Sequence, residues 1–256
     1  MTRKLPKRVM PCLLVSDGAL VKTVRFKKAN YIGDAINTVR IFNEKEVDEL
    51  VVLDIDASVQ QKPIDLQFIR EVATECFMPV AYGGGIKHID QVKTILESGI
   101  EKVVINASAI DHPELISEIA ASYGSQSLIV SIDVKKNLFG KQEVVTDNAK
   151  RKTKRDPVAW AKEVEQRGAG EILITSVDQE GTWEGYDVDL IRRIADAVNI
   201  PVIAHGGAGS ILDMEQAFKE GHASAFAAGS MFVYQKKGFG VLINFPSKEQ
   251  IEEKLT

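Results

Sequence analysis

Two glycine-rich turns of the same kind occur in the two halves of the 256-residue sequence. The apolar run that begins at Pro79 ends in Gly83-Gly84-Gly85, and the run that begins at Pro201 ends in Gly206-Gly207. Glycines after a strand allow backbone N–H groups to approach an anion closely. One such turn alone is more often an ordinary strand-to-helix connection. The duplication, however, predicts a ligand with a phosphate at each end.

Asp133 is the residue best suited to acid–base chemistry. It ends the apolar run 128–132, so partial desolvation is expected to raise its pKa toward a value useful for proton transfer. The alternative role is a helix cap or a loop salt bridge, and for Asp178 and Glu180 both roles remain open. Other polar candidates at expected strand ends are Asp17, Asp54, Asp56, Asn106, Thr175 and Ser176.

The composition argues against several other classes of protein. The net charge of -4 disfavours a general nucleic-acid surface, and no apolar run approaches the roughly 20 residues of a membrane span. Cys12 and Cys76 are too few for a disulfide framework, and the four histidines lack ligand spacing. We therefore expect a cytoplasmic protein with no metal, no cofactor, and no affinity for nucleic acid or membranes.

Eight buried strand patterns alternate with amphipathic helix patterns. This alternation predicts one (β/α)8 barrel domain over residues 1–256, with chemistry at the carboxyl ends of its strands. An open doubly wound sheet is the alternative, disfavoured because phosphate turns follow strands in both halves. The strands are expected at 8–15, 50–55, 79–83, 103–106, 128–133, 171–175, 202–204 and 223–227.

An internal repeat supports the barrel. An offset of 122 positions relates Pro79 to Pro201, Glu49 to Glu171 and Gly84 to Gly206. One offset shared by strands and turns predicts two half-barrels, roughly 1–123 and 124–256. Between strand five and the helix that Asp156-Pro157 should open, the polar stretch 135–154 is predicted to be a long loop, with a basic cluster at 150–155.

The sequence resembles the cyclase subunit of imidazole glycerol phosphate synthase. The resemblance covers roughly 8–231 and includes the stretches 12–13, 17–18, 48–50, 83–86, 102–103 with Asn106, 167–173, 178–182 and 206–209. It implies a half-barrel-duplicated (β/α)8 protein that pairs with a glutaminase subunit. It further implies that ammonia passes through the barrel to split and cyclise a bisphosphorylated substrate, with aspartates at the ends of strands one and five doing acid–base work.

Only one of those two aspartates is present. The strand-five aspartate corresponds to Asp133, but the family motif Cys-Leu-Asp-Val reads Cys12-Leu13-Leu14-Val15 here. Loss of one member of an acid–base pair typically costs roughly 10²–10⁴ in rate. The sequence also departs from the family pattern at Glu180, where Asp is usual, at His205, where a small polar residue is common, and at 150–155, which lacks Thr-Gly.

The resemblance assigns two further sets of residues. A charged ring at the ammonia entrance would consist of Arg8, Glu49, Lys102 and Glu171, for which a structural salt-bridge plug is the alternative. The phosphate-binding positions would be Gly83, Gly84, Gly85, Asn106, Gly181, Gly206, Gly207, Gly229 and Ser230.

These residues lead to three hypotheses. The leading one is a cyclase-like subunit that forms a heterodimer with a glutaminase. It supplies ammonia to a sugar amidotransferase that makes acetamidino sugars for bacterial surface polysaccharides, a branch suggested by the segment 18–58. The second is the cyclase/lyase of histidine biosynthesis, with another acid in place of Leu14. The third is a non-catalytic scaffold that activates its glutaminase.

Overall fold

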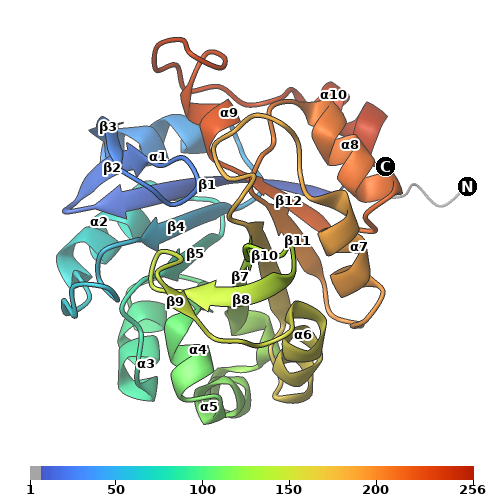
Figure 1. Cartoon of the computed structure of the whole chain (residues 1–256). Coiled ribbons are helices and arrows are strands. Elements are labelled where there is room, and N and C mark those ends of the chain that lie inside the picture. Colours follow the sequence, from blue (N-terminus) through green and yellow to red (C-terminus); the bar gives the residue numbers. More distant parts are fainter. Residues whose placement is uncertain (1–6) are drawn as a thin grey trace, which may run out of the picture.

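Eight parallel strands form a closed barrel surrounded by helices (Figure 1). The computed structural model describes residues 7–256. The barrel order is β10-β11-β12-β1-β4-β5-β6-β7, and pairing of β7 with β10 closes the ring. The strands are β1 (Arg8–Ser16), β4 (Leu50–Asp54), β5 (Val80–Gly83), β6 (Lys102–Ile105), β7 (Leu128–Lys136), β10 (Glu171–Ser176), β11 (Val202–His205) and β12 (Ala225–Ala228). The predicted fold class is confirmed.

The helices follow the strands around the outside of the barrel. Many begin with the capping residues that the sequence offers; Asp156, for instance, accepts hydrogen bonds from two backbone N–H groups just after Pro157. The helices are α1 (Ala35–Glu44), α2 (Leu66–Glu75), α3 (Ile89–Glu97), α4 (Ala107–Asp111), α5 (Glu114–Tyr123), α6 (Pro157–Gln166), α7 (Val188–Ala195), α8 (Ile211–Lys219), α9 (Ser230–Val233) and α10 (Lys248–Leu255), with a 3-10 turn at Ser125–Ser127.

Each half of the barrel begins in the same way. The first strand of each half, β1 or β7, is nine residues long and continues into an antiparallel hairpin. The hairpin after β1 consists of β2 (Ala19–Lys22) and β3 (Asn30–Asp34), and the one after β7 consists of β8 (Gln142–Thr146) and β9 (Arg151–Lys152). The internal repeat of the sequence therefore has a structural counterpart in both hairpins.

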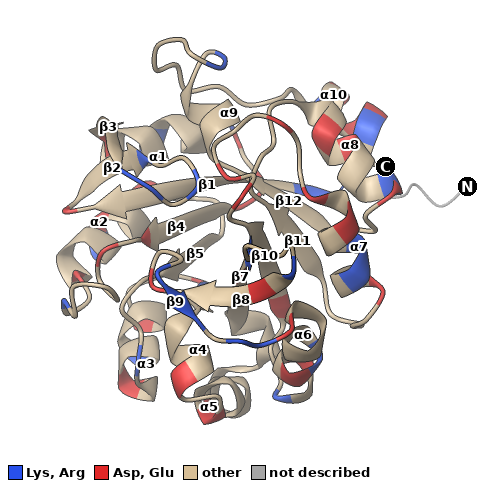
Figure 2. Cartoon of the chain, viewed as in Figure 1, with Lys and Arg blue, Asp and Glu red and all other residues tan. Residues whose placement is uncertain are grey.

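The predicted long loop between strand five and the following helix is wrong. Residues 142–152 form β8 and β9, because Val144 and Val145 are buried and pair with β7 in register. Arg151 forms ion pairs with Asp111 and Asp147, which hold the basic cluster in place. In Figure 2 this cluster is the blue stretch beside β8. Elsewhere both signs of charge occur on the helices and loops.

Strand parity determines which side chains enter the barrel. In β1, Val9, Leu13 and Val15 pack outward against the helices, whereas Met10, Cys12 and Leu14 point into the barrel interior. The same alternation places Ile129 inside the barrel and Val130 and Ile132 outside it. Because both faces are buried, the strands read as nearly continuous apolar runs rather than alternating ones.

Gly170 is a position where the fold tolerates no side chain. A Cβ added there would overlap the carbonyl group of Ser125, which is backbone and cannot move aside cheaply. We expect Gly170→Ala to lower the free energy of unfolding by about 1–3 kcal/mol. Gly33→Ala, where the added Cβ meets open space, should change it by less than about 0.5 kcal/mol. Urea denaturation of both variants compares them, and equal midpoints would contradict the expectation.

Candidate active site

A closed ring of charges lies at the amino-terminal ends of the barrel strands. Arg8 is the first residue of β1, Lys102 of β6 and Glu171 of β10, and Glu49 immediately precedes β4. Arg8 contacts Glu49 at 2.5 Å and Glu171 at 2.6 Å, and Lys102 contacts the same two carboxylates at 2.8 and 2.7 Å. Each cation thus bridges both anions. The four residues predicted to form this ring are brought together.

The ring is electrically balanced, which its burial requires. Burial alone would raise the pKa of Glu171, but hydrogen bonds and charge attraction from Arg8 and Lys102 outweigh it and hold the pKa below its usual value. A buried charge without a partner would cost several kcal/mol. If the ring were to open, each cation would therefore have to keep its contact with one of its two carboxylates. The geometry allows this, because every member has two partners.

Asp133 lies at the opposite end of the barrel. Strand parity directs it inward, where Asn106 donates a hydrogen bond to Asp133 Oδ2 at 3.1 Å. Burial raises the pKa of Asp133 to about 7, against hydrogen bonds from Thr175, Ser131 and Asn106 that lower it. The negative charge of Glu180 raises it further. Such a carboxyl group can both donate and accept a proton near neutral pH.

A cavity opens beside Asp133. Its walls come from both halves of the barrel, and its lining includes Leu14, Asp54, Ser58, Gly83, Gly84, Gly85, Asn106, Ser108, Ser131, Asp133, Thr175, Glu180 and His205. The first glycine turn thus borders the same cavity as Asp133. Gly84 has φ +128°, and an added Cβ would lie 2.5 Å from the carbonyl oxygen of Asp54, so glycine is required there.

The second glycine turn lies outside this cavity. Gly206, Gly207, Gly229 and Ser230 are buried and are not among its lining residues. Gly207 accepts a hydrogen bond from Gly185 on the connection between β10 and α7, which packs over the turn. Lys22 packs against Gly229, and Gly181 packs against Thr23 of the first hairpin. Phosphate binding at either turn remains a prediction.

Lys22 is a site residue that sequence reasoning missed. Its Nζ lies 2.9 Å from Glu180 Oε1, and both side chains are at most 4% exposed. On the other side of Glu180, His205 Nε2 lies 3.9 Å from Oε2, and His205 Nδ1 lies 3.1 Å from the Thr175 hydroxyl. The sequence signal was weak: Lys22 follows the apolar run Ala19-Leu20-Val21 in a basic stretch, 18–30, that is compatible with either a loop or a hairpin.

Leu14 occupies the position in the first half that Asp133 occupies in the second. Leu14 pairs with Val21 of its hairpin and Leu53 of the next barrel strand, whereas Asp133 pairs with Val145 and Thr175. Leu53 and Thr175 are themselves separated by the repeat offset of 122. The register therefore places an apolar side chain where the first half would carry the matching acid.

The remaining acidic candidates have structural partners. Asp178 accepts a hydrogen bond from the backbone N–H of Lys136 at 2.8 Å and does not line the cavity. Asp17 pairs with Lys62 at 2.5 Å, and Asp56 accepts a hydrogen bond from the Ser16 hydroxyl at 2.5 Å. Of the acidic candidates other than Asp133, Glu180 and Asp54 line the cavity beside it.

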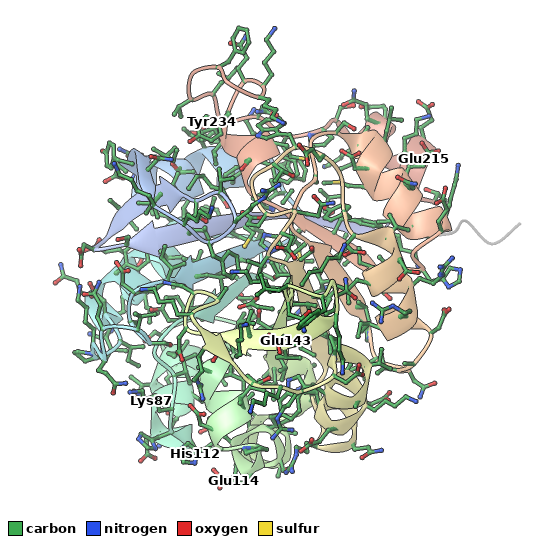
Figure 3. All side chains as sticks on the ribbon, in the orientation of Figure 1. Lys87, His112, Glu114, Glu143, Glu215 and Tyr234 are labelled. Atoms are coloured by element: carbon green, nitrogen blue, oxygen red, sulfur yellow. The ribbon has the colours of Figure 1, made fainter. Side chains whose placement is uncertain are left out.

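The described residues contain neither a metal cluster nor a membrane-spanning helix. Within residues 7–256, no three His, Cys, Asp or Glu side chains converge to hold an ion. Figure 3 labels His112 and Glu114 at the periphery of the molecule and Glu143, on β8, near the centre of the view, so these three side chains are not close together. In the same range, no helix is both long and apolar enough to cross a bilayer.

Comparison with known proteins agrees with this arrangement. The family model described as "Histidine biosynthesis protein" matches residues 8–238. The chain belongs to this histidine biosynthesis protein family. The match extends from the charged ring at Arg8 to beyond the second glycine turn, so both ends of the barrel fall within the family region.

Family relatives cover nearly the whole chain. A Pseudomonas aeruginosa protein, provisionally named imidazole glycerol phosphate synthase subunit hisF2, is 48% identical over 246 residues, 96% of this chain and 98% of its own length. A Leptospira interrogans protein, provisionally named subunit HisF of the same synthase, is 44% identical over 97% and 98% of the two chains. Subunit HisF of Alkaliphilus metalliredigens is 43% identical over 91% and 92%. These relatives confirm the resemblance to the cyclase subunit.

The pKa of Asp133 predicts a specific pH dependence of stability. A carboxyl group whose pKa rises from 3.8 to about 7 on folding makes the folded state bind the extra proton, so stability falls between these pH values and levels off above pH 7. We expect Asp133→Asn to gain stability relative to the native chain across this range, by up to about 4 kcal/mol. Denaturant titrations at pH 4 to 8.5 measure the difference; a constant difference would contradict the prediction.

Proposed function

We propose that this chain is the ammonia-using barrel of a glutamine-dependent imidazole glycerol phosphate synthase. In this proposal a glutaminase subunit docks at the amino-terminal ends of the strands, and ammonia enters through the ring of Arg8, Glu49, Lys102 and Glu171. It reacts at the opposite end with a phosphorylated ligand, where Asp133 serves as general acid and base. The observation that carries the proposal is the alignment of a balanced charged ring and a proton-exchanging carboxyl group on one barrel.

The arrangement of charges and polar groups at the two barrel ends supports these separate roles in ammonia entry and in ligand chemistry. A neutral ring of two cations and two anions can rearrange without leaving an unpaired charge, which suits a passage for a small neutral molecule. At the other end, the cavity joins Asp133 to the backbone turn at Gly83–Gly85 and to Asn106. A phosphate bound at that turn would place the ligand within reach of the Asp133 carboxyl group.

A second candidate function is supported by Leu14. In that alternative the barrel accepts ammonia in the same way but delivers it to a sugar amidotransferase that makes acetamidino sugars for surface polysaccharides. A leucine cannot exchange a proton, so the first half of the barrel lacks the acid that the cyclisation would use there. The names of the relatives favour the synthase. Activity assays distinguish the synthase from this alternative and from the non-catalytic scaffold.

The charged ring can be tested by comparing the two nitrogen sources. We expect Glu171→Gln to reduce glutamine-driven product formation at least about tenfold while leaving the reaction with added ammonium salt nearly unchanged, because only the former needs the passage. Arg40 and Glu75 form an exposed ion pair on the helices, so Glu75→Gln serves as the matched control. Equal losses with both nitrogen sources would contradict a role in ammonia entry.

The missing acid can be tested by restoring it. If the chain catalyses the synthase reaction slowly for want of a second acid, Leu14→Asp should raise the rate by roughly 10²–10⁴, the usual contribution of such a group. The rate with the bisphosphate substrate of the synthase and ammonium salt measures this. A native rate already normal, left unchanged by the substitution, would instead mean that another group has replaced the acid. No turnover by either protein would favour ammonia delivery or the scaffold.

A further inference from the structure

A chain of polar side chains extends from Asp133 into the second half of the barrel. Thr175 lies opposite Asp133 in the β7–β10 register and lines the same cavity, so its hydroxyl can donate to the Asp133 carboxyl group, whose pKa it lowers. The same hydroxyl lies 3.1 Å from His205 Nδ1. The chain continues from His205 Nε2 across 3.9 Å to Glu180, which Lys22 holds at 2.9 Å. These groups lie in the barrel interior beside the cavity.

The Thr175 hydroxyl has only one proton for its two neighbours. A hydroxyl donates one hydrogen bond and accepts others, so Thr175 cannot donate to Asp133 and to His205 at the same time. When Asp133 is ionised, Thr175 must donate to the carboxylate and accept from His205 Nδ1–H. His205 Nε2 is then unprotonated, which fits its position in the structure, buried without a hydrogen-bond partner and 3.9 Å from the Glu180 carboxylate.

When Asp133 is protonated, donor and acceptor are exchanged in every hydrogen bond of this series of side chains. A proton that arrives at His205 Nε2 releases the Nδ1 proton to the Thr175 oxygen, and the original Thr175 proton passes to Asp133. The carboxyl group then donates to Thr175, Thr175 donates to Nδ1, and Nε2–H faces Glu180. One proton has entered at Nε2 and one has reached Asp133, so His205 remains neutral and only its tautomer has changed.

We propose that His205 is a positioning residue for Asp133, and that Thr175 couples the protonation of Asp133 to the tautomer of His205. The pair gives the site a second side chain that can pass a proton, although Leu14 contributes none. The proposal rests on the proposed function only in taking Asp133 as the group that exchanges a proton with the ligand. The coupling itself is a property of the free protein.

Burial favours the neutral form of His205. Burial lowers the pKa of His205, Glu180 raises it and Lys22 lowers it again, with a net lowering. Burial raises the pKa of the nearby Cys12 thiol to about 12, so it stays protonated. The Tyr186 hydroxyl donates to the backbone of Ala227. Asp54 also lines the cavity, where burial raises its pKa, but its carboxylate accepts hydrogen bonds from the backbone N–H groups of Asp56 and Ala57. His205 responds to the protonation of Asp133 through its tautomer.

Nitrogen-15 NMR of the full chain tests the coupling directly. The four histidines give few signals in a long-range proton–nitrogen correlation, and His205→Gln identifies the His205 signals by their loss. We expect His205 to change from the Nε2–H to the Nδ1–H tautomer as the pH rises, with a midpoint near 7, the pKa of Asp133. In Thr175→Val, which keeps the shape but removes the hydroxyl, this change should disappear.

Two further variants make the result decisive. Asp133→Asn should also give a pH-independent tautomer, and it carries the test if Thr175→Val does not fold. Thr38→Val removes a buried hydroxyl of α1 that donates to the backbone of Asp34, so it should leave the tautomer change intact. A His205 tautomer that is constant from pH 5.5 to 8.5 in the native chain, or that still changes in Thr175→Val, would overturn the coupling.

The same variants separate this inference from the proposed function. If the tautomer change occurs but Asp133→Asn leaves product formation intact, Asp133 is not the acid–base group of the reaction and the coupling stands. If product formation requires Asp133 while the His205 tautomer never changes, the function stands and the coupling fails. Where the coupling holds, Thr175→Val should shift the pH at which turnover changes. A merely structural loss would lower turnover without shifting that pH.

Discussion

Closure of eight parallel strands determines which side chains meet inside this protein. Once β7 pairs with β10, each strand has a neighbour on both sides, and alternate residues must point into one dry interior. This parity directs Leu14, Ser131 and Asp133 inward together with small apolar residues. Polar groups that enter are therefore stabilised mainly by partners on neighbouring strands.

The two ends of the barrel provide these partners differently. At the amino-terminal ends of the strands, four charges neutralise one another, and each has two partners. At the carboxyl ends, Asp133 has only neutral hydrogen-bond donors, so burial raises its pKa to about 7 rather than being offset by a cation. The cation of that region, Lys22, forms an ion pair with Glu180 instead. The residues at one end therefore keep their charged forms, whereas the other end holds a carboxyl group that can gain or lose a proton.

The two halves have also diverged from their common pattern. The first half presents its glycine turn to an open cavity and has Leu14 at the position of the acid. The second half presents Asp133 but covers its glycine turn with the connection that carries Glu180. In the proposed function, ligand contacts and proton transfer would come from opposite halves across one cavity, which is the usual advantage of building a site at the ends of several strands.

The sequence by itself predicted the barrel and its repeat, because continuous apolar strands and a constant offset are local patterns. The resemblance to the cyclase subunit added the four ring residues and the contrast between Leu14 and Asp133. The sequence did not reveal the β8–β9 hairpin, whose polar residues resemble a loop until Val144 and Val145 pair with β7. Nor did it reveal the partners of Lys22, Thr175 and His205. Those contacts join residues up to 158 positions apart, and only closure of the sheet brings them into one interior.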